Sequence, residues 1–189
     1  MIETSTIIES IYYILKKVKK ADKIKLVKLI YLADKYHLIR YGRTITNDDY
    51  YAMEHGPVGT TVKEVLNFDE FNMSRKALKY ASSLIEKIDN NNFKAKANAK
   101  NDFDMLSDSD KEALDFVIEK FGKMRQWELR DYTHKYPEWY QYEDLFRNKR
   151  TKRERLHTKE LLSTIKDDPL AMPKKHIKES KGMLTGTFD

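Results

Sequence analysis

Residues 23–41 read KIKLVKLIYLADKYHLIRY, and this stretch decides the fold. Its apolar side chains recur at helical spacing and cover a face that is wide for a surface helix. They are Leu26, Val27, Leu29, Ile30, Ala33 and Leu38. Asp22 is placed to cap the first turn, and Gly42 is placed to end the helix in a left-handed conformation. The sequence therefore predicts a central, buried helix.

Further helices are predicted on both sides of this one from the same kind of apolar spacing. They cover about residues 6–20, 58–67, 74–88, 107–122, 126–136 and 138–148. Two of them show the spacing of a capping box, in which two side chains satisfy free backbone groups at a helix start. The pairs are Thr6 with Glu9 and Ser109 with Glu112. Pro137 separates the last two helices.

Two stretches are predicted to be extended. Residues 43–58 are β-branched and aromatic, which indicates a short strand or extended turn before a break at Gly56 and Pro57. There Gly permits a positive φ, and Pro favours the first turn of the next helix. Residues 90–100 alternate in polarity and are expected to pair with residues 45–53. The predicted fold class is mainly α, a compact multi-helix domain with a small β hairpin or short sheet element.

The composition narrows the class of protein. The 189 residues suffice for one domain with its own core, and 12 Tyr, 8 Phe and 2 Trp are more aromatic residues than a disordered chain carries. The absence of cysteine excludes disulfides, thiolate zinc sites and a Cys nucleophile. Residues 1–10 lack the apolar stretch of a signal peptide, and no run of about 18 apolar residues occurs that could span a membrane. We therefore expect a cytoplasmic protein with no membrane contact.

The formal net charge of +6 is concentrated in one place. Residues 147–155 hold six basic residues and one acid, a net charge of +5, which leaves only +1 for the rest of the chain. Such a run can be a solvated helix face, a docking surface that attracts an acidic protein, or a contact to nucleic acid. We expect residues 1–150 to form the helical domain and residues 151–189 to form a basic, amphipathic and partly flexible extension.

Three segments together resemble a known family. They are residues 25–38 (KLVKLIYLADKYHL), residues 41–58 with YGRTIT and YAMEHGPV, and residues 128–139 (ELRDYTHKYPEW). In this order and spacing they resemble the Panacea domain, also described as the SocA-like or phage-associated GepA-type domain, over about residues 5–150. Many members place Pro directly before the Trp of the third segment, whereas Glu138 separates Pro137 from Trp139 in this chain.

The resemblance implies an antitoxin of a bacterial or prophage toxin–antitoxin pair, which neutralises a cognate toxin by direct protein–protein binding. The toxins of the family are of several unrelated types, including small alarmone synthetases, and one member delivers its toxin to a cytoplasmic protease. It is not known as an enzyme family, so neither catalytic residues nor a cofactor are expected. A homo-oligomer or a hetero-oligomer with the toxin is a further expectation. The matching motif residues, which we expect to be structural, are Leu26, Lys28, Leu29, Tyr31, Ala33, Asp34, His37, Gly42, Arg43, Gly56, Pro57, Val58, Leu129, His134 and Pro137.

The residues expected to contact a toxin are aromatic anchors and cations that steer the encounter. The anchors are the exposed members of the set Tyr50, Tyr51, His55, Tyr132, Trp139, Tyr140 and Tyr142. The cations are Arg147, Lys149, Arg150, Lys152 and Arg153. A groove beside Gly56 would display Tyr51 and His55 to such a partner.

Two other classes of function stay open. A DNA-binding regulator would use the basic run, although the chain shows no strong helix-turn-helix signature. A metal-dependent hydrolase would need His37, His55 and His134 to converge with carboxylates such as Asp34 or Asp49, and neither His-x-x-x-His nor His-Glu-x-x-His occurs. Gly-x-Ser-x-Gly and a phosphate-binding Gly-rich loop are absent as well. We expect structural histidines and no metal.

Overall fold

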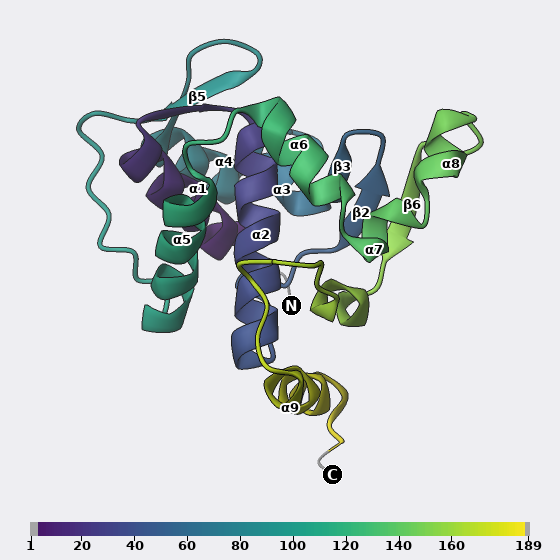
Figure 1. Ribbon diagram of the computed structural model, residues 1–189. Helices are drawn as coiled ribbons and strands as arrows, with labels where there is room; N and C mark the ends of the chain where they lie inside the picture. The colour runs from purple at the N-terminus through teal and green to yellow at the C-terminus, as the bar shows by residue number, and fades with distance from the viewer. Residues whose placement is uncertain (1–3, 188–189) are drawn as a thin grey trace.

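Helix α2 (Lys23–Tyr41) runs through the middle of the computed structural model, which describes residues 4–187, and other helices pack around it (Figure 1). The Asp22 carboxylate caps it by accepting a hydrogen bond of 3.0 Å from a first-turn backbone N–H. Gly42 ends it in the left-handed conformation, with φ 73°. Every residue from 26 to 39 is buried, which confirms the predicted central helix.

Four helices from the first two thirds of the chain build the core with α2. They are α1 (Thr4–Val18), α3 (Thr60–Asn67), α4 (Arg75–Leu84) and α5 (Asp108–Phe121). Helix α1 contacts each of the others, and α5 lies along α2. The fold is mainly α with minor β, as predicted. Within residues 4–187, no helix has the length and apolar character needed to cross a membrane.

Helix α5 starts earlier than the spacing of Ser109 and Glu112 predicts. Its N-cap is Ser107, whose hydroxyl accepts from the Asp110 N–H while the Asp110 carboxylate accepts from the Ser107 N–H. Both serines have an acidic residue three positions on, but the Ser109 hydroxyl is instead 3.0 Å from Nε2 of His37. The predicted capping box is therefore wrong by two residues.

Helix α1 includes Thr6 and Glu9 in its interior, so these two residues do not form the predicted capping box. The Glu9 side chain is buried. Its carboxylate accepts hydrogen bonds from the Asn101 side chain and from the Met105 N–H, both at 3.0 Å. Because a buried carboxylate needs such donors, Glu9 fastens the loop before α5 to α1.

A three-stranded antiparallel sheet lies beside α1, in the strand order β1-β5-β4. The strands are β1 (Lys20–Asp22), β4 (Ile85–Lys87) and β5 (Asn92–Ala95). The prediction that residues 90–100 pair with residues 45–53 is wrong, because β5 pairs with β1 and β4. The Asp89 carboxylate accepts from two following backbone N–H groups and closes a tight turn between β4 and β5. The helix predicted over residues 74–88 accordingly ends at Leu84.

A second three-stranded antiparallel sheet has the order β3-β2-β6. Its strands are β2 (Tyr50–Met53), β3 (Gly56–Gly59) and β6 (Arg153–Leu156). Gly56 and Pro57 therefore lie in an edge strand, where the missing N–H of Pro is tolerated, and not in the turn that the sequence predicts. Helix α3 starts after this strand, at Thr60, and the Asp48 carboxylate accepts from the Val62 N–H in its first turn at 3.0 Å.

Residues 126–148 form three helices where the sequence predicts two. They are α6 (Gln126–His134), α7 (Pro137–Tyr140) and α8 (Glu143–Arg147). Pro137 occupies the first position of α7, where its missing N–H would have no intrahelical partner in any case. Tyr142 has φ −104° and ψ 0°, which is not helical, and this separates α7 from α8.

The basic run at residues 147–155 does not form a helix face. It leaves the end of α8, turns, and continues as β6, where Arg155 lies opposite Tyr51 of β2. This run therefore supplies the third strand of the second sheet and forms an arm at one side of the molecule (Figure 1). The 3₁₀-helix η1 (Thr158–Leu162) follows it and contacts α2 and α7. The division of the chain at residue 150 stays a prediction.

The last helix, α9 (Lys174–Thr185), lies across the C-terminal end of α2 (Figure 1). The Ser180 hydroxyl donates to the Ile39 carbonyl at 2.6 Å, and Nε2 of His176 lies 2.7 Å from the Arg40 carbonyl. Both carbonyls belong to the last turn of α2, so α9 satisfies groups that a helix end leaves without intrahelical partners. The partial flexibility expected of the extension stays a prediction.

Candidate partner-binding groove

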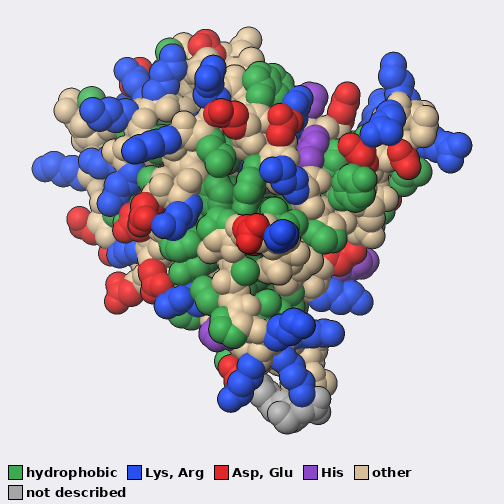
Figure 2. All heavy atoms as spheres, in the orientation of Figure 1, with side chains coloured by type: hydrophobic (Ala, Val, Ile, Leu, Met, Phe, Trp, Pro, Cys, Tyr) green, Lys and Arg blue, Asp and Glu red, His purple; other side chains and the backbone are tan. Residues whose placement is uncertain are grey.

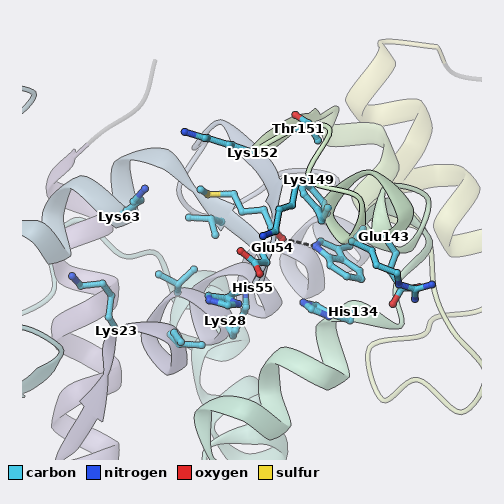
Figure 3. Close-up of a pocket in the computed structure, with 17 residues that line it drawn as sticks. Lys23, Lys28, Glu54, His55, Lys63, His134, Glu143, Lys149, Thr151 and Lys152 are labelled. Atoms are coloured by element: carbon cyan, nitrogen blue, oxygen red, sulfur yellow. Dashed lines mark hydrogen bonds and ion pairs between the residues drawn. The ribbon is translucent and has the colours of Figure 1, made fainter.

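A groove of about 800 Å³ opens between the start of α2, the β2–β3 hairpin and the arm that follows α7 (Figure 3). Its floor is aliphatic and consists mainly of Ile24, Val27 and Val58. The size lies within the usual range for binding cavities, which are mostly apolar with a few polar groups. Most of the polar groups here are nitrogen-bearing side chains.

Trp139 forms one wall of this groove, and its position is fixed on three sides. Its indole N–H donates to the Met53 carbonyl at 2.8 Å, which ties α7 to the hairpin. The His134 ring stacks on the indole with centroids 3.5 Å apart, and the Phe146 ring lies 6.0 Å away, nearly parallel. Only 3% of Trp139 is exposed, so both faces of the indole are already covered.

His134 brings a buried nitrogen to the same wall. Its Nε2 atom is shielded from solvent and makes no hydrogen bond to any residue that the structure describes. Burial lowers the pKa of His134 to about 4, and the nearby positive charges of Lys28 and Arg130 act in the same direction. The imidazole is therefore neutral at pH 7, with an unused polar atom beside the groove.

Lys28 lies at the base of the groove and is only 1% exposed. Its ammonium group donates to the Pro57 carbonyl at 2.8 Å, and within residues 4–187 it forms no ion pair with a carboxylate. Burial holds the pKa of Lys28 well below its usual value. Gly56 passes directly above it with φ 97°, and a Cβ at this position would lie 2.7 Å from the Lys28 Nζ atom. Glycine at this position lets the hairpin approach α2 closely.

The rim of the groove is rich in cations. Lys23 and Lys63 stand on the side of α2 and α3, and Arg147, Lys149 and Lys152 stand on the arm. Figure 2 shows Lys and Arg side chains gathered at the outer end of this arm. The carboxylates on the rim are Glu54 and Glu143, and Glu143 is already paired with Arg147 at 3.3 Å. The rim therefore has a positive net charge.

Asp34 carries a buried polar network that supports the hairpin from below. Its carboxylate accepts from the Ile45 N–H at 2.8 Å, from the N–H and hydroxyl of Thr46, and from the Tyr50 hydroxyl at 2.7 Å. Burial raises the pKa of Asp34 to about 6, and these hydrogen bonds oppose the rise. The network fixes the start of β2, and with it the position of the groove.

An ion pair between Lys35 and Glu138 supports the wall formed by α7. The Lys35 Nζ atom lies 2.6 Å from the Glu138 carboxylate, and neither side chain is exposed. The Tyr31 and Ser163 hydroxyls also donate to this carboxylate. Because every member has a partner, the pair joins α2, α7 and the segment after η1 without an unpaired charge.

The structure brings several of the predicted contact residues together in the groove. Those lining it are His55, Trp139, Arg147, Lys149 and Lys152. Tyr51 and Arg153 instead line a smaller hollow on the neighbouring face of the hairpin, with the Arg153 guanidinium 5.0 Å from the centre of the Tyr51 ring. Arg150 is exposed on the arm and lines neither cavity.

Other predicted contact residues lie elsewhere. Tyr50 is 4% exposed and serves the Asp34 network, so it is not among the exposed anchors. Tyr132 packs against Phe121 in the core. Tyr140 is 62% exposed on α7, and Tyr142 is half-buried.

Sequence reasoning missed some residues of this surface. The sequence marks Lys28 only as a motif residue expected to be structural, and no pattern in it singles out Lys23, Lys63 or Trp127. Trp127 is 46% exposed and lies 5.8 Å from the His55 ring, beside the groove. Lys28 could have drawn attention to this surface, because it lies between apolar residues of a helix that is predicted to be buried. A lysine at such a position is costly to bury without a partner.

The histidines do not gather as metal ligands would. His37 is buried, with Nδ1 2.8 Å from the Arg43 carbonyl and Nε2 near Ser109, far from the groove that His55 and His134 line. In the part of the chain that the structure describes, no cluster of three His, Asp or Glu side chains could hold a metal ion.

Comparison with known proteins agrees with the motif residues. The family model described as "Antitoxin SocA-like, Panacea domain" matches residues 26–140, more than half of the chain. The comparisons with curated proteins and with solved structures found no match. The matched segment contains most of α2, both strands of the hairpin, His134 and Trp139, and hence the base of the groove. The chain therefore belongs to the SocA-like antitoxin family defined by the Panacea domain.

Proposed function

We propose that this protein is the antitoxin of a toxin–antitoxin pair and that it neutralises its toxin in the cytoplasm by binding it directly at the groove. The observation that carries the proposal is the groove itself, with an aliphatic floor, a cationic rim and a base built from the family motif. An apolar centre with a polar rim is typical of protein interfaces.

Neutralisation would work by occlusion, in which the folded domain covers the active surface of the toxin. A specific interface buries about 1,600 Å² in total, which exceeds the groove and therefore includes its flanks. Aromatic residues with exposed surface on these flanks are the candidate anchors, namely the half-buried Tyr51 and the exposed Trp127 and Tyr140. Arg147, Lys149 and Lys152 would speed association with an acidic toxin surface.

The same geometry supports binding and not catalysis. Among the residues that line the groove, the hydroxyl-bearing side chain is Thr151, and its hydroxyl donates to the Arg153 carbonyl at 2.9 Å and not to a base. His134 faces Trp139 and has no described hydroxyl or carboxylate as a hydrogen-bond partner. A nucleophile activated by an adjacent base is therefore not assembled in the described part of the groove.

A co-expression growth test examines the proposal. The protein encoded beside this chain is induced in cells with and without the antitoxin, and we expect growth only when both are present. The two purified proteins should also form a complex that survives gel filtration. Cells that die in both cases, or proteins that elute separately, would contradict the proposal.

The amount of toxin distinguishes blockade from delivery to a protease. Under blockade, the toxin level in rescued cells stays unchanged or rises, whereas a proteolytic adaptor would lower it. A gel shift with the promoter DNA of the pair at two salt concentrations tests the remaining alternative. Sequence-selective DNA binding by the free chain would favour a regulator, since non-specific binding by the basic arm is lost as salt rises.

A further inference from the structure

Lys28 is a buried lysine that has no carboxylate partner in the described chain. An ammonium group carries three donors, and the Pro57 carbonyl accepts one of them. Buried charges in proteins are normally paired, because leaving water is costly for an ion without a counter-charge. A buried lysine at the base of an open groove therefore indicates a place for an anionic group from outside.

The Nε2 atom of His134 adds a second unused polar group at the same end. Lys28 comes from α2 and His134 from α6, and the charge of Lys28 is close enough to lower the pKa of His134. Figure 3 shows both side chains below Glu54 and His55, at the base of the groove. A carboxylate that enters can accept from the Lys28 ammonium group directly and would favour the protonated form of His134, which can then donate as well.

The rest of the groove indicates what accompanies the anionic group. Its floor is formed by the aliphatic side chains of Ile24, Val27 and Val58, which suits a large aliphatic or aromatic side chain. Trp139 is not available as a stacking platform for a nucleobase, because the His134 ring already stacks on it and only 3% of the residue is exposed. These contacts favour a protein segment over a nucleotide or a nucleic acid.

We propose that the groove receives a segment of the toxin in which an Asp or Glu lies beside a large apolar residue, and that Lys28 is the buried partner of its carboxylate. This inference rests on the proposed antitoxin function. The cationic rim is complementary in charge to such a segment, and its steering effect would act before the carboxylate reaches the base of the groove.

The first experiment measures binding of the toxin encoded beside this chain to the variant Lys28→Met. Met has a similar length and no charge, so it can fill the site without an unpaired ion. We expect the dissociation constant to rise about 30-fold or more, as when one member of a buried charge pair is removed. Lys76→Met on exposed α4 is the matched control and should bind like the original chain. An unchanged dissociation constant for Lys28→Met, with an unchanged thermal midpoint, would overturn the inference.

A double-mutant cycle identifies the carboxylate. Lys28→Met is combined with single Asp→Asn and Glu→Gln changes on the toxin surface, and one of these should lose its effect in the Lys28→Met background. If every toxin variant behaves additively with Lys28→Met, the assigned ion pair does not exist. The antitoxin function would then still stand, provided that the original chain rescues growth.

A second experiment does not need the toxin. A capped peptide of alternating Leu and Glu, and its Leu and Gln counterpart, are titrated into the full chain while the His134 ring is followed by NMR. We expect the acidic peptide to shift the ring signals and the amide peptide to leave them unchanged, and Lys28→Met should abolish the shift. Equal shifts from both peptides, or a shift from inorganic phosphate or ATP but not from the acidic peptide, would contradict the proposal.

Discussion

Lys35 and Glu138 form an ion pair at 2.6 Å in which neither side chain has any exposed surface. The pair joins the central helix α2 to α7, whose Trp139 forms a wall of the groove. Lys35 also donates to the Leu161 carbonyl at 2.9 Å, so the pair reaches η1 as well. A buried pair of this kind holds three elements in one arrangement, and its removal tests how far the groove depends on them.

Glu138→Gln should lower the free energy of unfolding by about 3–5 kcal/mol, because it leaves the Lys35 charge buried without a counter-charge. Urea denaturation measures the change. Glu119→Gln, at an exposed pair with Lys120, is the control and should change stability by less than about 1 kcal/mol. The double variant Lys35→Met with Glu138→Leu should recover part of the loss, and a Glu138→Gln protein as stable as the original would contradict the role of the pair.

Gly56→Ala should cost about 2 kcal/mol or more, because residue 56 has φ 97° and its Cβ would lie 2.7 Å from the Lys28 Nζ atom. Gly186→Ala is the control, since Gly186 also has a positive φ, 68°, but a Cβ added there would meet no atom within 4 Å. Its cost should be about 1 kcal/mol, from the backbone conformation alone. Thermal unfolding of both variants measures the difference, and equal costs would show that the Lys28 contact does not matter.

The stability of the protein should fall as the pH drops from 6.5 toward 4, in part because of His134. Its pKa in the folded state is about 4, below the ordinary value of 6.5, so its contribution is fully present above pH 6.5 and is lost on acidification. Asp34 acts in the opposite direction, because its pKa is raised to about 6. Urea denaturation of the original chain and of His134→Phe at pH 7 and pH 4.5 isolates the histidine, since the other groups are common to both proteins. NMR titration of the His134 ring should give a midpoint well below 6, and a midpoint at 6.5 would refute the shift.

Ser180→Ala should lower the free energy of unfolding by about 1 kcal/mol, because it leaves the buried Ile39 carbonyl without the hydroxyl that caps it. Ser83→Ala removes an exposed hydroxyl that bonds only to the nearby Tyr80 carbonyl, and it should have little effect. Hydrogen exchange of the last amides of α2 should become faster in Ser180→Ala alone. Equal exchange in both variants would mean that α9 does not stabilise the end of α2.

Features that depend on neighbours along the chain could be predicted from the sequence. Asp22 and Gly42 mark the ends of α2, and both signals lie within a few residues of the turns that they cap. The pairing of β5 could not be predicted in the same way, because alternation in polarity identifies a strand but not its partner. The Asp89 turn, which decides the pairing, has the common composition of a loop.

The candidate groove could be predicted only in part. The sequence singled out Lys28, Gly56 and His134 as motif residues, but it gave no indication that they meet at the base of one cavity. Their contact depends on how α2, the hairpin and α6 pack in three dimensions. The sequence likewise shows the positive charge of residues 147–155, but it does not show that part of this run forms strand β6. That strand pairs with β2, which lies about a hundred residues earlier in the chain.

The two sides of the groove come from different parts of the chain. The base, from Lys28 to Trp139, lies inside the segment that the family model matches, whereas the outer wall at residues 147–152 lies beyond it. The base residues are also tied into the buried hydrogen bonds and ion pair, while the wall residues project from a short arm. If the groove binds the toxin as proposed, exchange of the wall between relatives would alter which companion is accepted and leave the framework of the base intact.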